Sequence, residues 1–220
     1  MAQSLRIDHP KGMDPHRHAT LSASRHGGDP EDYWPLHHLM DATKELCSDN
    51  RHRLLHNLWG IRQVVIPLVG PVIEAAGRTV RTKTVLEHDH VQADFGGRFI
   101  PTLTDFVDAI APEGDESKRF VGIQAPYRDD DEAMRLLLSP YFVTGRIRAL
   151  LVTHNTWFLG ELLPRLCRRP PRLVPPGVPP DELFARMKFE AWMDNGATLP
   201  KSAPRRSAFT PLSKEAPCRS

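Results

Sequence analysis

LHHLMDATKELCSDNRHRLLHNLWGIRQVVI, residues 36–66, contains two runs of apolar side chains at helical spacing. The first run forms one core-facing stripe from Leu36, Leu39, Met40, Thr43, Leu46 and Cys47. The second forms another stripe from Leu54, Leu55, Leu58, Trp59, Ile61, Val65 and Ile66. Ser48-Asp49 breaks the phase between them, and Pro67 and Gly70 end the second run. We therefore predict two helices, from about Leu36 and from about Asp49 to Ile66, packed through these stripes.

The sequence on either side extends this helical pattern. Asp29 and Pro30 are typical of a helix start, although Pro35 must bend or restart that helix. Apolar and polar residues alternate over 72–86, around Ala76-Gly77, which predicts a short β-hairpin. Further helices are predicted at 103–110, 129–138, 140–163 and 181–193. The expected fold class is mainly α with a small β-hairpin (α+β), as a compact helical domain with a C-terminal helical appendage.

The same pattern suggests how the chain is organised. Residues 1–26 show no apolar period and are expected to form a flexible arm. Residues 27–112 are expected to form a His-rich helical core with the hairpin, and residues 120–196 a helical C-terminal part. Much of the excess of proline, 21 in 220 residues, lies in the C-terminal third. It predicts an extended linker at 165–180, and residues 197–220 are expected to form a disordered tail.

Composition narrows the class of protein. Hydrophobic residues make up 40% and charged residues 25% of the chain, as in ordinary globular proteins. No run of 18 apolar residues occurs, so we expect neither a membrane span nor export, and a cytoplasmic location. Cys47, Cys167 and Cys218 lie far apart and are expected to be reduced thiols. A net charge of +2 is too small for a nucleic-acid footprint, although nucleic acid is left open as a partner.

Histidine is the second residue type in excess, with 11 in the chain. On the predicted second helix, Asp49, His52 and His56 fall at steps of three and four, so they share one helix face with Gly60 and Gln63. Two imidazoles four residues apart on a helix can bind one metal ion. A second group, Glu87-His88-Asp89-His90 with Asp94, follows the hairpin in a segment interpreted as a loop. The predicted metal ligands are Asp49, His52, His56, Glu87 and His90, and the ion is zinc or another divalent metal.

Three further residues are candidates for catalysis. Asp41 and Lys44 lie on the polar face of the first predicted helix, and Arg51 lies beside His52. A divalent ion with an open position for water would generate a hydroxide nucleophile, while Lys44 or Arg51 holds an anionic small-molecule substrate. Hydrolysis is the implied reaction. One variant of this hypothesis resembles the helical metal phosphohydrolases of the His-Asp type, with His56 and the pair His88-Asp89 as ligands.

Several motifs together resemble an uncharacterised family of small bacterial and bacteriophage proteins. They are a Gly-Gly turn, a Pro-x-His helix start, an Arg-His-Arg segment, and a Glu/Asp-His motif that precedes IPTL, all within about residues 18–110. The matching residues are Gly27, Gly28, His37, Asp41, Lys44, Asp49, Arg51, His52, Arg53, Glu87, His90 and Asp94. The resemblance implies that these residues act together, and it implies no particular reaction.

Two other functional classes stay open at this point. One is a non-catalytic interaction protein of phage or mobile-element origin, whose exposed Arg/His face binds protein or nucleic acid. The other is a metal-free structural module with scattered histidines. An internal echo, H-N-x-W at 56–59 and again at 154–157, leaves open a duplication. Convergence of histidines and carboxylates in three dimensions would favour the metal site.

Overall fold

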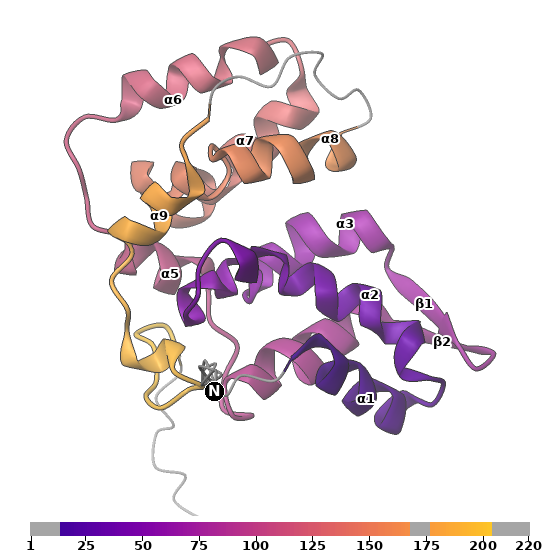
Figure 1. The fold of residues 1–220 in the computed structure, drawn as a ribbon. Helices are drawn as coiled ribbons and strands as arrows, with labels where there is room; N and C mark the ends of the chain where they lie inside the picture. The colour runs from indigo at the N-terminus through magenta and orange to yellow at the C-terminus, as the bar shows by residue number, and fades with distance from the viewer. Residues whose placement is uncertain (1–13, 168–176, 204–220) are drawn as a thin grey trace, which may run out of the picture.

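The computed structural model describes residues 14–167 and 177–203, and Figure 1 shows their arrangement in two halves. The N-terminal half forms the lower part of this view, and the C-terminal half, with α6, α7 and α8, forms the upper part. The chain then returns from α9 along one side of the lower half. Within the described residues the fold is mainly α with one two-stranded antiparallel sheet, which confirms the predicted fold class.

The N-terminal half contains most of the short elements. They are α1 (Pro15–His26), α2 (Pro30–Met40), the 3-10 helices η1 (Ala42–Glu45) and η2 (Asn50–Leu55), and a helix made of η3 (Gly60–Val65) and α3 (Ile66–Val69). The hairpin strands β1 (Val72–Ala75) and β2 (Arg78–Arg81) follow. A second composite helix, α4 (Thr82–Thr84) with η4 (Val85–Gln92), and then α5 (Leu103–Ala109) complete this half.

The C-terminal half is built of helices in the described residues. They are α6 (Ser117–Gln124), η5 (Ala125–Tyr127), α7 (Asp131–Thr144), η6 (Ile147–Val152), η7 (Phe158–Leu162), α8 (Leu163–Leu166), α9 (Pro180–Arg186) and η8 (Ala191–Met193). The prediction of one helix over 140–163 is wrong. Pro140 lies inside α7, and that helix ends at Gly145, whose φ of 66° is left-handed. The predicted helix over 181–193 is also wrong, because α9 ends at Arg186 and Met187 pairs with Ile110.

The hairpin forms as predicted. Val72 pairs with Arg81 and Ala75 with Arg78, so the turn contains only Ala76 and Gly77. Both turn residues have positive φ, 47° and 71°, as a two-residue hairpin turn requires. The hairpin leads directly into the composite helix of α4 and η4, so it sets where that helix begins.

The predicted helix from Asp49 to Ile66 is interrupted at His56-Asn57. Asn57 caps the next helix: its side-chain oxygen accepts from the backbone N–H of Gly60 at 3.0 Å, and its amide donates to the Leu54 carbonyl at 2.8 Å. The chain turns so tightly that a Cβ at Gly60 would lie 2.2 Å from the Leu55 carbonyl oxygen. A local asparagine cap therefore overrides the apolar period. His56 then points in a direction that a continuous helix would not give it.

Residues 15–26 form α1 instead of a flexible arm. Asp14 caps the helix by accepting from the Arg17 N–H at 2.9 Å, and Pro15 takes the first position. The buried side chains of α1 are His18, Ala19 and Ser22, so the helix docks largely through polar groups. This explains why the sequence lacks an apolar period there. Residues 1–13 lie outside the described residues.

Residues 87–90 are helical, although the sequence pattern suggested a loop. They belong to the composite helix of α4 and η4, which continues through Asp94. In this helix His90 and Asp94 stand one turn apart and are both buried, whereas His88 is exposed. Because this segment is a helix and not an extended loop, His90 and Asp94 face the interior together, whereas His88 does not.

The two H-N-x-W segments have the same local structure. In each, a 3-10 helix ends just before the His-Asn pair, and a helix with a π-helical segment and a proline follows. Asn155 repeats the cap of Asn57, since its oxygen accepts from the Phe158 N–H at 2.9 Å and its amide donates to the Val152 carbonyl at 3.0 Å. The repeated sequence motif therefore has a repeated local structure, and His56 and His154 occupy equivalent positions in it.

Both predicted apolar stripes contribute to one core. Leu36, Leu39, Leu54, Leu55 and Ile61 are buried in the same hydrophobic cluster. The segment that begins in the last turn of α9, residues 184–203, is here called the C-terminal strap. It also belongs to this core, because Trp192 packs against Phe95 and Phe106. The prediction of a disordered tail from 197 fails for 197–203, where Ser202 bonds to Asp105. Residues 204–220 and 168–176, the latter within the predicted linker, lie outside the described residues.

Within the part of the chain that the structure describes, none of the helices combines the length and the apolar character needed to cross a membrane.

Candidate metal centre

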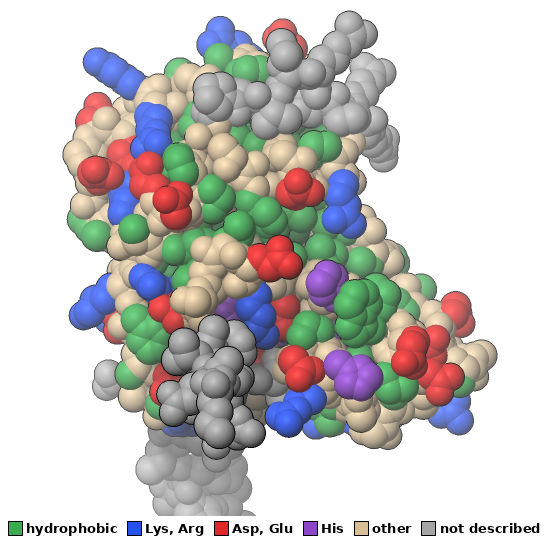
Figure 2. Space-filling view, in the orientation of Figure 1, with side chains coloured by type: hydrophobic (Ala, Val, Ile, Leu, Met, Phe, Trp, Pro, Cys, Tyr) green, Lys and Arg blue, Asp and Glu red, His purple; other side chains and the backbone are tan. Residues whose placement is uncertain are grey.

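Histidines are concentrated inside the molecule. Figure 2 shows only small histidine patches on this face, and the buried histidines are His18, His37, His52, His56, His90 and His154. Among the described residues, five of these six lie in the N-terminal half, together with buried aspartates that include Asp41, Asp89 and Asp94. Ionisable side chains are rarely buried without partners, so this grouping calls for a physical explanation.

Four side chains from three parts of the chain converge on one point, and we call them the His/Asp cluster. Asp41 ends α2, His56 follows η2, His90 lies on η4, and Asp94 stands one turn beyond His90. Their exposed fractions are 5%, 0%, 0% and 4%. One ligand atom from each lies within 4.8 Å of every other, which is the separation expected of groups that could share one metal ion.

The distances within the cluster are short. His56 Nε2 lies 2.9 Å from His90 Nε2, 3.1 Å from Asp94 Oδ2 and 3.4 Å from Asp41 Oδ1. His90 Nε2 lies 3.9 Å from each of the two carboxylates. A tetrahedral metal with bonds of about 2.1 Å separates its ligand atoms by about 3.4 Å. The observed separations, from 2.9 to 3.9 Å, lie on both sides of that value.

A hydrogen-bond chain fixes which nitrogen of His90 faces the cluster. Ser22 Oγ donates its only hydrogen to Asp89 Oδ2 at 3.1 Å, so it accepts from His37 Nε2 at 2.9 Å. His37 Nδ1 then presents a lone pair to His90 Nδ1, 2.8 Å away, and His90 Nδ1 carries the proton. His90 Nε2 is therefore left with a lone pair directed into the cluster, as in a histidine oriented for metal binding.

His52 repeats this arrangement at the edge of the cluster. Its Nδ1 lies 2.5 Å from the backbone carbonyl of Asp49, so Nδ1 is the protonated nitrogen. Nε2 is buried, makes no hydrogen bond among the described residues, and lies 3.7 Å from Asp41 Oδ1. A nitrogen lone pair facing a carboxylate oxygen is repulsive unless a proton or a cation lies between them.

Protonation states in the cluster are shifted by burial and by the neighbouring groups. Burial lowers the pKa of His90 well below its ordinary value. Burial also opposes charge on His56, but the carboxylates of Asp41 and Asp94 outweigh it and raise the pKa of His56. Desolvation tends to raise the pKa of Asp94, yet hydrogen bonds from His18 and His56 and the charge of Arg53 hold it well below the usual range. Without an ion, the cluster therefore concentrates its positive charge on His56.

Two cationic or polar side chains complete the surroundings of Asp94. Arg53 Nη2 lies 3.3 Å from Asp94 Oδ1, and His18 Nε2 lies 3.2 Å from the same oxygen. His18 Nδ1 contacts the Asp89 carbonyl at 2.7 Å, and its ring stacks on His90 with centroids 4.0 Å apart. Asp94 Oδ2 therefore faces the cluster, while Oδ1 is bound by Arg53 and His18.

His154 shows how a buried histidine is satisfied without carboxylates. Thr153 Oγ donates to the Leu137 carbonyl at 2.7 Å, so it can accept from His154 Nδ1 at 3.1 Å. His154 Nε2 accepts from the Gln124 amide at 2.9 Å. Each ring nitrogen therefore has a partner that suits a neutral imidazole, in contrast to His52 and His56. The equivalent positions in the two halves thus differ in chemistry.

Burial lowers the pKa of His154 to about 4 from its ordinary value of 6.5. Its neutral form therefore contributes stability that is complete above pH 6.5 and is lost as the pH falls towards 4, because the unfolded chain binds the proton more readily. We expect this residue to account for about 2 kcal/mol of lost unfolding free energy between pH 7 and pH 5. Denaturant titrations of wild type and His154→Gln at both pH values measure it, and equal losses in the two proteins would contradict it.

The structure brings some of the predicted site residues together and separates others. His56, His90 and Asp41 belong to the cluster, and His52 lies at its edge. Lys44 Nζ lies 3.3 Å from Asp41 Oδ2 and is partly exposed. Asp49 instead pairs with Arg51 at 2.9 Å, and Glu87 pairs with Arg62 at 3.4 Å, so neither carboxylate reaches the cluster. Arg51 also donates to two strap carbonyls, at 2.7 and 3.0 Å, which directs it away from the cluster.

Sequence reasoning missed several parts of the site. The sequence pattern groups Asp94 with the second His/acid segment, but the predicted ligand set does not include it, and an extended loop gives no particular spacing that would select it. Helical spacing places it four residues after His90. His18 and Ser22 were assigned to a flexible arm, and no local signal places them here. The His-Asp pair of the phosphohydrolase variant does not converge either, because His88 is exposed and Asp89 contacts Ser22, Arg25 and His26.

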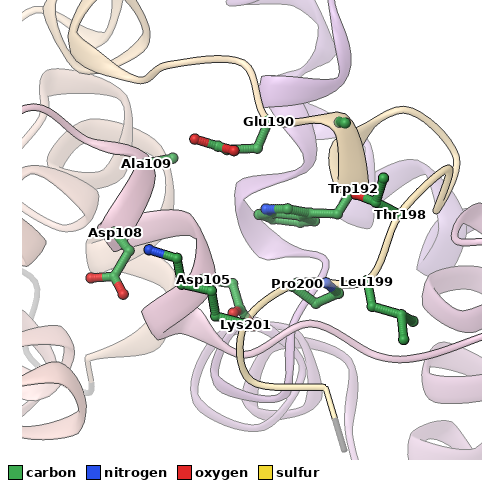
Figure 3. A pocket seen from close by; sticks show the side chains of 10 residues that line it. Asp105, Asp108, Ala109, Glu190, Trp192, Thr198, Leu199, Pro200 and Lys201 are labelled. Atoms are coloured by element: carbon green, nitrogen blue, oxygen red, sulfur yellow. The ribbon is translucent and has the colours of Figure 1, made fainter. Parts of the chain in front are cut away.

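A separate cavity of about 150 Å³ lies between α5 and the strap (Figure 3). Its lining includes Asp105, Asp108, Glu190, Trp192 and Lys201. All three carboxylates have partners. Asp105 accepts from the Thr102 N–H in the capping box of α5, Asp108 pairs with Arg146 at 2.6 Å, and Glu190 lies 3.8 Å from Lys188. The cavity shares no lining residue with the His/Asp cluster.

Residues 13–114 match the model of a family described as a domain of unknown function (DUF6915). The match covers just under half of the chain, and the matched residues are here called the DUF6915-like segment. It contains every residue of the His/Asp cluster and ends before α6, so the strap and the C-terminal half lie outside the match. The expectation of an uncharacterised family is confirmed, and the family has no established activity. No curated protein and no solved structure matches the chain.

Proposed function

We propose that the DUF6915-like segment binds one divalent metal ion at Asp41, His56, His90 and Asp94, with His52 as a further donor at the edge. The observation that carries this proposal is His52 Nε2, a buried lone pair without a hydrogen bond that faces Asp41 Oδ1 at 3.7 Å. An ion in the cluster would turn this repulsive contact into an attractive one.

Charge balance supports a single ion. Asp41 and Asp94 contribute two negative charges, and buried Arg53 contributes one positive charge. One divalent ion that displaces the proton of His56 leaves a net charge of about +1, whereas two ions would leave about +3 in a desolvated interior. His18, His37 and His90 also lie within metal-binding distance of one another. However, His37 Nε2 already bonds to Ser22, and His37 Nδ1 already bonds to His90 Nδ1. These three histidines are therefore better suited to orienting His90 than to binding a second ion.

The donor set favours an imidazole-preferring ion. Nitrogen donors from histidine combined with carboxylate oxygens suit Zn²⁺ and other first-row divalent ions better than Ca²⁺ or Mg²⁺, which prefer oxygen ligands alone. The backbone carbonyl at His52 and the Ser22-His37 chain at His90 are outer contacts of the kind that raise ligand basicity and fix ring orientation. We propose zinc as the first ion to test.

Hydrolase-type chemistry is a finer proposal for the same site. A bound divalent ion supplies Lewis acidity and lowers the pKa of water. Lys44 stands beside Asp41, the most exposed member of the cluster, so it can attract an anionic substrate to that side. Arg51 does not support this role because it is engaged by the strap. The alternative, a phage or mobile-element interaction protein, predicts no convergence of histidines with carboxylates, so the cluster favours metal binding.

The metal proposal predicts that protein purified without a histidine tag retains about one equivalent of a first-row divalent metal after dialysis. Removing it with a chelator should lower the Tm, because an ion that binds only the folded state stabilises it by mass action. Elemental analysis and thermal scans before and after chelation measure both effects. If the protein contains no metal, takes up none of Zn²⁺, Mn²⁺ or Ni²⁺, and keeps its Tm when they are added, the metal proposal is wrong and the non-catalytic interaction protein becomes the leading alternative.

A further inference from the structure

The C-terminal strap is held on the DUF6915-like segment through the backbone carbonyls of the strap. Arg51 Nη1 donates to the carbonyls of Phe184 and Met187, at 2.7 and 3.0 Å, and Arg53 Nη1 donates to that of Met193 at 3.3 Å. Arg98 donates to the carbonyl of Gly196. In Figure 1 this segment runs down beside the lower half of the molecule. Arginine side chains of the DUF6915-like segment therefore hydrogen-bond to the strap, which lies outside the family match.

Arg53 is the link between this contact and the His/Asp cluster. Its guanidinium is 2% exposed and lies 5.5 Å from the centre of the Phe95 ring. Nη2 contacts both Asp94 Oδ1 at 3.3 Å and Asn195 Oδ1 at 3.2 Å. A planar, buried guanidinium cannot adjust to one partner without moving relative to the other. The position of Asp94 and the position of the strap are therefore mechanically connected.

Asn195 is shaped for this contact. Its φ of 49° is left-handed, and the following Gly196, with φ of 73°, packs so closely that a Cβ there would lie 2.5 Å from the Phe95 carbonyl oxygen. The turn therefore brings the Asn195 side chain onto Arg53 at the cost of an uncommon backbone conformation. Trp192, three residues earlier, anchors the same turn against Phe95 and Phe106.

We propose that Arg53 couples metal occupancy of the cluster to docking of the C-terminal strap, with Arg53 and Asn195 acting as positioning residues for Asp94. This inference rests on the metal site proposed above. With the ion present, Asp94 Oδ2 is fixed and Oδ1 holds Arg53 in register with the strap. Without it, Asp94 Oδ2 keeps only the contacts with His56 and His90, so Asp94 and Arg53 are held less firmly in register with Asn195. Coupling of this kind is reciprocal, so strap contacts must strengthen metal binding by the same factor.

The cleanest test is Asn195→Gly, because glycine accepts the left-handed backbone and removes the contact to Arg53 together with only one long hydrogen bond to Asp194, at 3.4 Å. We expect its Kd for Zn²⁺ to rise about tenfold, as for loss of an outer contact to a ligand. Lys188→Ala is the control: Lys188 also lies in the strap, but its side chain is 79% exposed and faces Glu190 at 3.8 Å. Arg53→Lys keeps the charge and loses the planar fork, so it should weaken binding in the same direction. Competition titrations with a chromogenic chelator give each Kd.

Hydrogen exchange provides a readout that does not depend on affinity. In wild-type protein, chelation should speed amide exchange in peptides covering 188–203 more than in peptides covering α7, and adding Zn²⁺ should reverse it. In Asn195→Gly this metal dependence should shrink. Wild type that binds Zn²⁺, with equal Kd values in all variants and strap exchange independent of metal, overturns the coupling and leaves the metal site standing. Wild type that binds no ion overturns both.

Discussion

We expect His56→Ala to abolish metal binding, reducing bound metal from about one equivalent to near zero. His56 Nε2 lies within 3.4 Å of all three other donor atoms of the cluster, so its loss removes a ligand from the centre of the set. Loss of one of four ligands is expected to weaken binding by at least about two orders of magnitude. The variant should also lose the increase in Tm that zinc gives to wild type. Elemental analysis and thermal scans with added Zn²⁺ measure both.

His154→Ala is a matched control within the same chain. Both histidines are fully buried, and both precede an asparagine that caps the next helix. The two substitutions should therefore disturb folding to a similar extent, but His154→Ala should keep its metal because no carboxylate faces it. If His56→Ala proves too unstable to study, Asp41→Asn, a change of nearly equal volume at the rim of the cluster, should show the same loss. Equal metal content in His56→Ala and His154→Ala would refute the proposed site.

Leu55→Asp is expected to unfold the protein. Leu55 is 0% exposed and sits in the main hydrophobic cluster, directly beside the tight turn to Gly60. An aspartate there loses the burial of a leucine side chain and places a carboxylate in an apolar environment. Together these should cost more than about 4 kcal/mol, a large fraction of a typical domain's stability. Circular dichroism of the purified variant should show greatly reduced helix content and no cooperative thermal transition.

Val121→Asp is the control for this substitution. Val121 lies on α6 and is 55% exposed, so the same carboxylate stays solvated and should change the unfolding free energy by less than about 0.5 kcal/mol. A Leu55→Asp protein with unchanged Tm and helix content would show that the two apolar stripes do not form the core. It would also remove the structural basis for the position of His56.

The candidate site shows where local pattern was sufficient and where it was not. His52, His56 and His90 could be selected from the sequence because histidines near carboxylates are uncommon and their spacing suggested convergence. Asp49 is a predicted ligand only if residues 49–66 form a continuous helix, and Glu87 only if residues 87–90 form an extended loop. Both assumptions failed, the first because the Asn57 cap turns the chain, and the second because residues 82–94 continue as a helix. Asp41 and Asp94 supply the carboxylates instead.

The sequence by itself determined the fold class, the hairpin at Ala76-Gly77 and the burial of the two leucine-rich stripes. These features depend on periodicity and turn chemistry, which act over a few neighbouring residues. Only the tertiary structure decided that α1 is ordered and which carboxylates meet the histidines. His18 and Ser22 are buried because Asp89 and Asp94, about seventy residues away, provide their partners. The strap, too, is fixed by arginines more than a hundred residues distant, and no local pattern encodes such contacts.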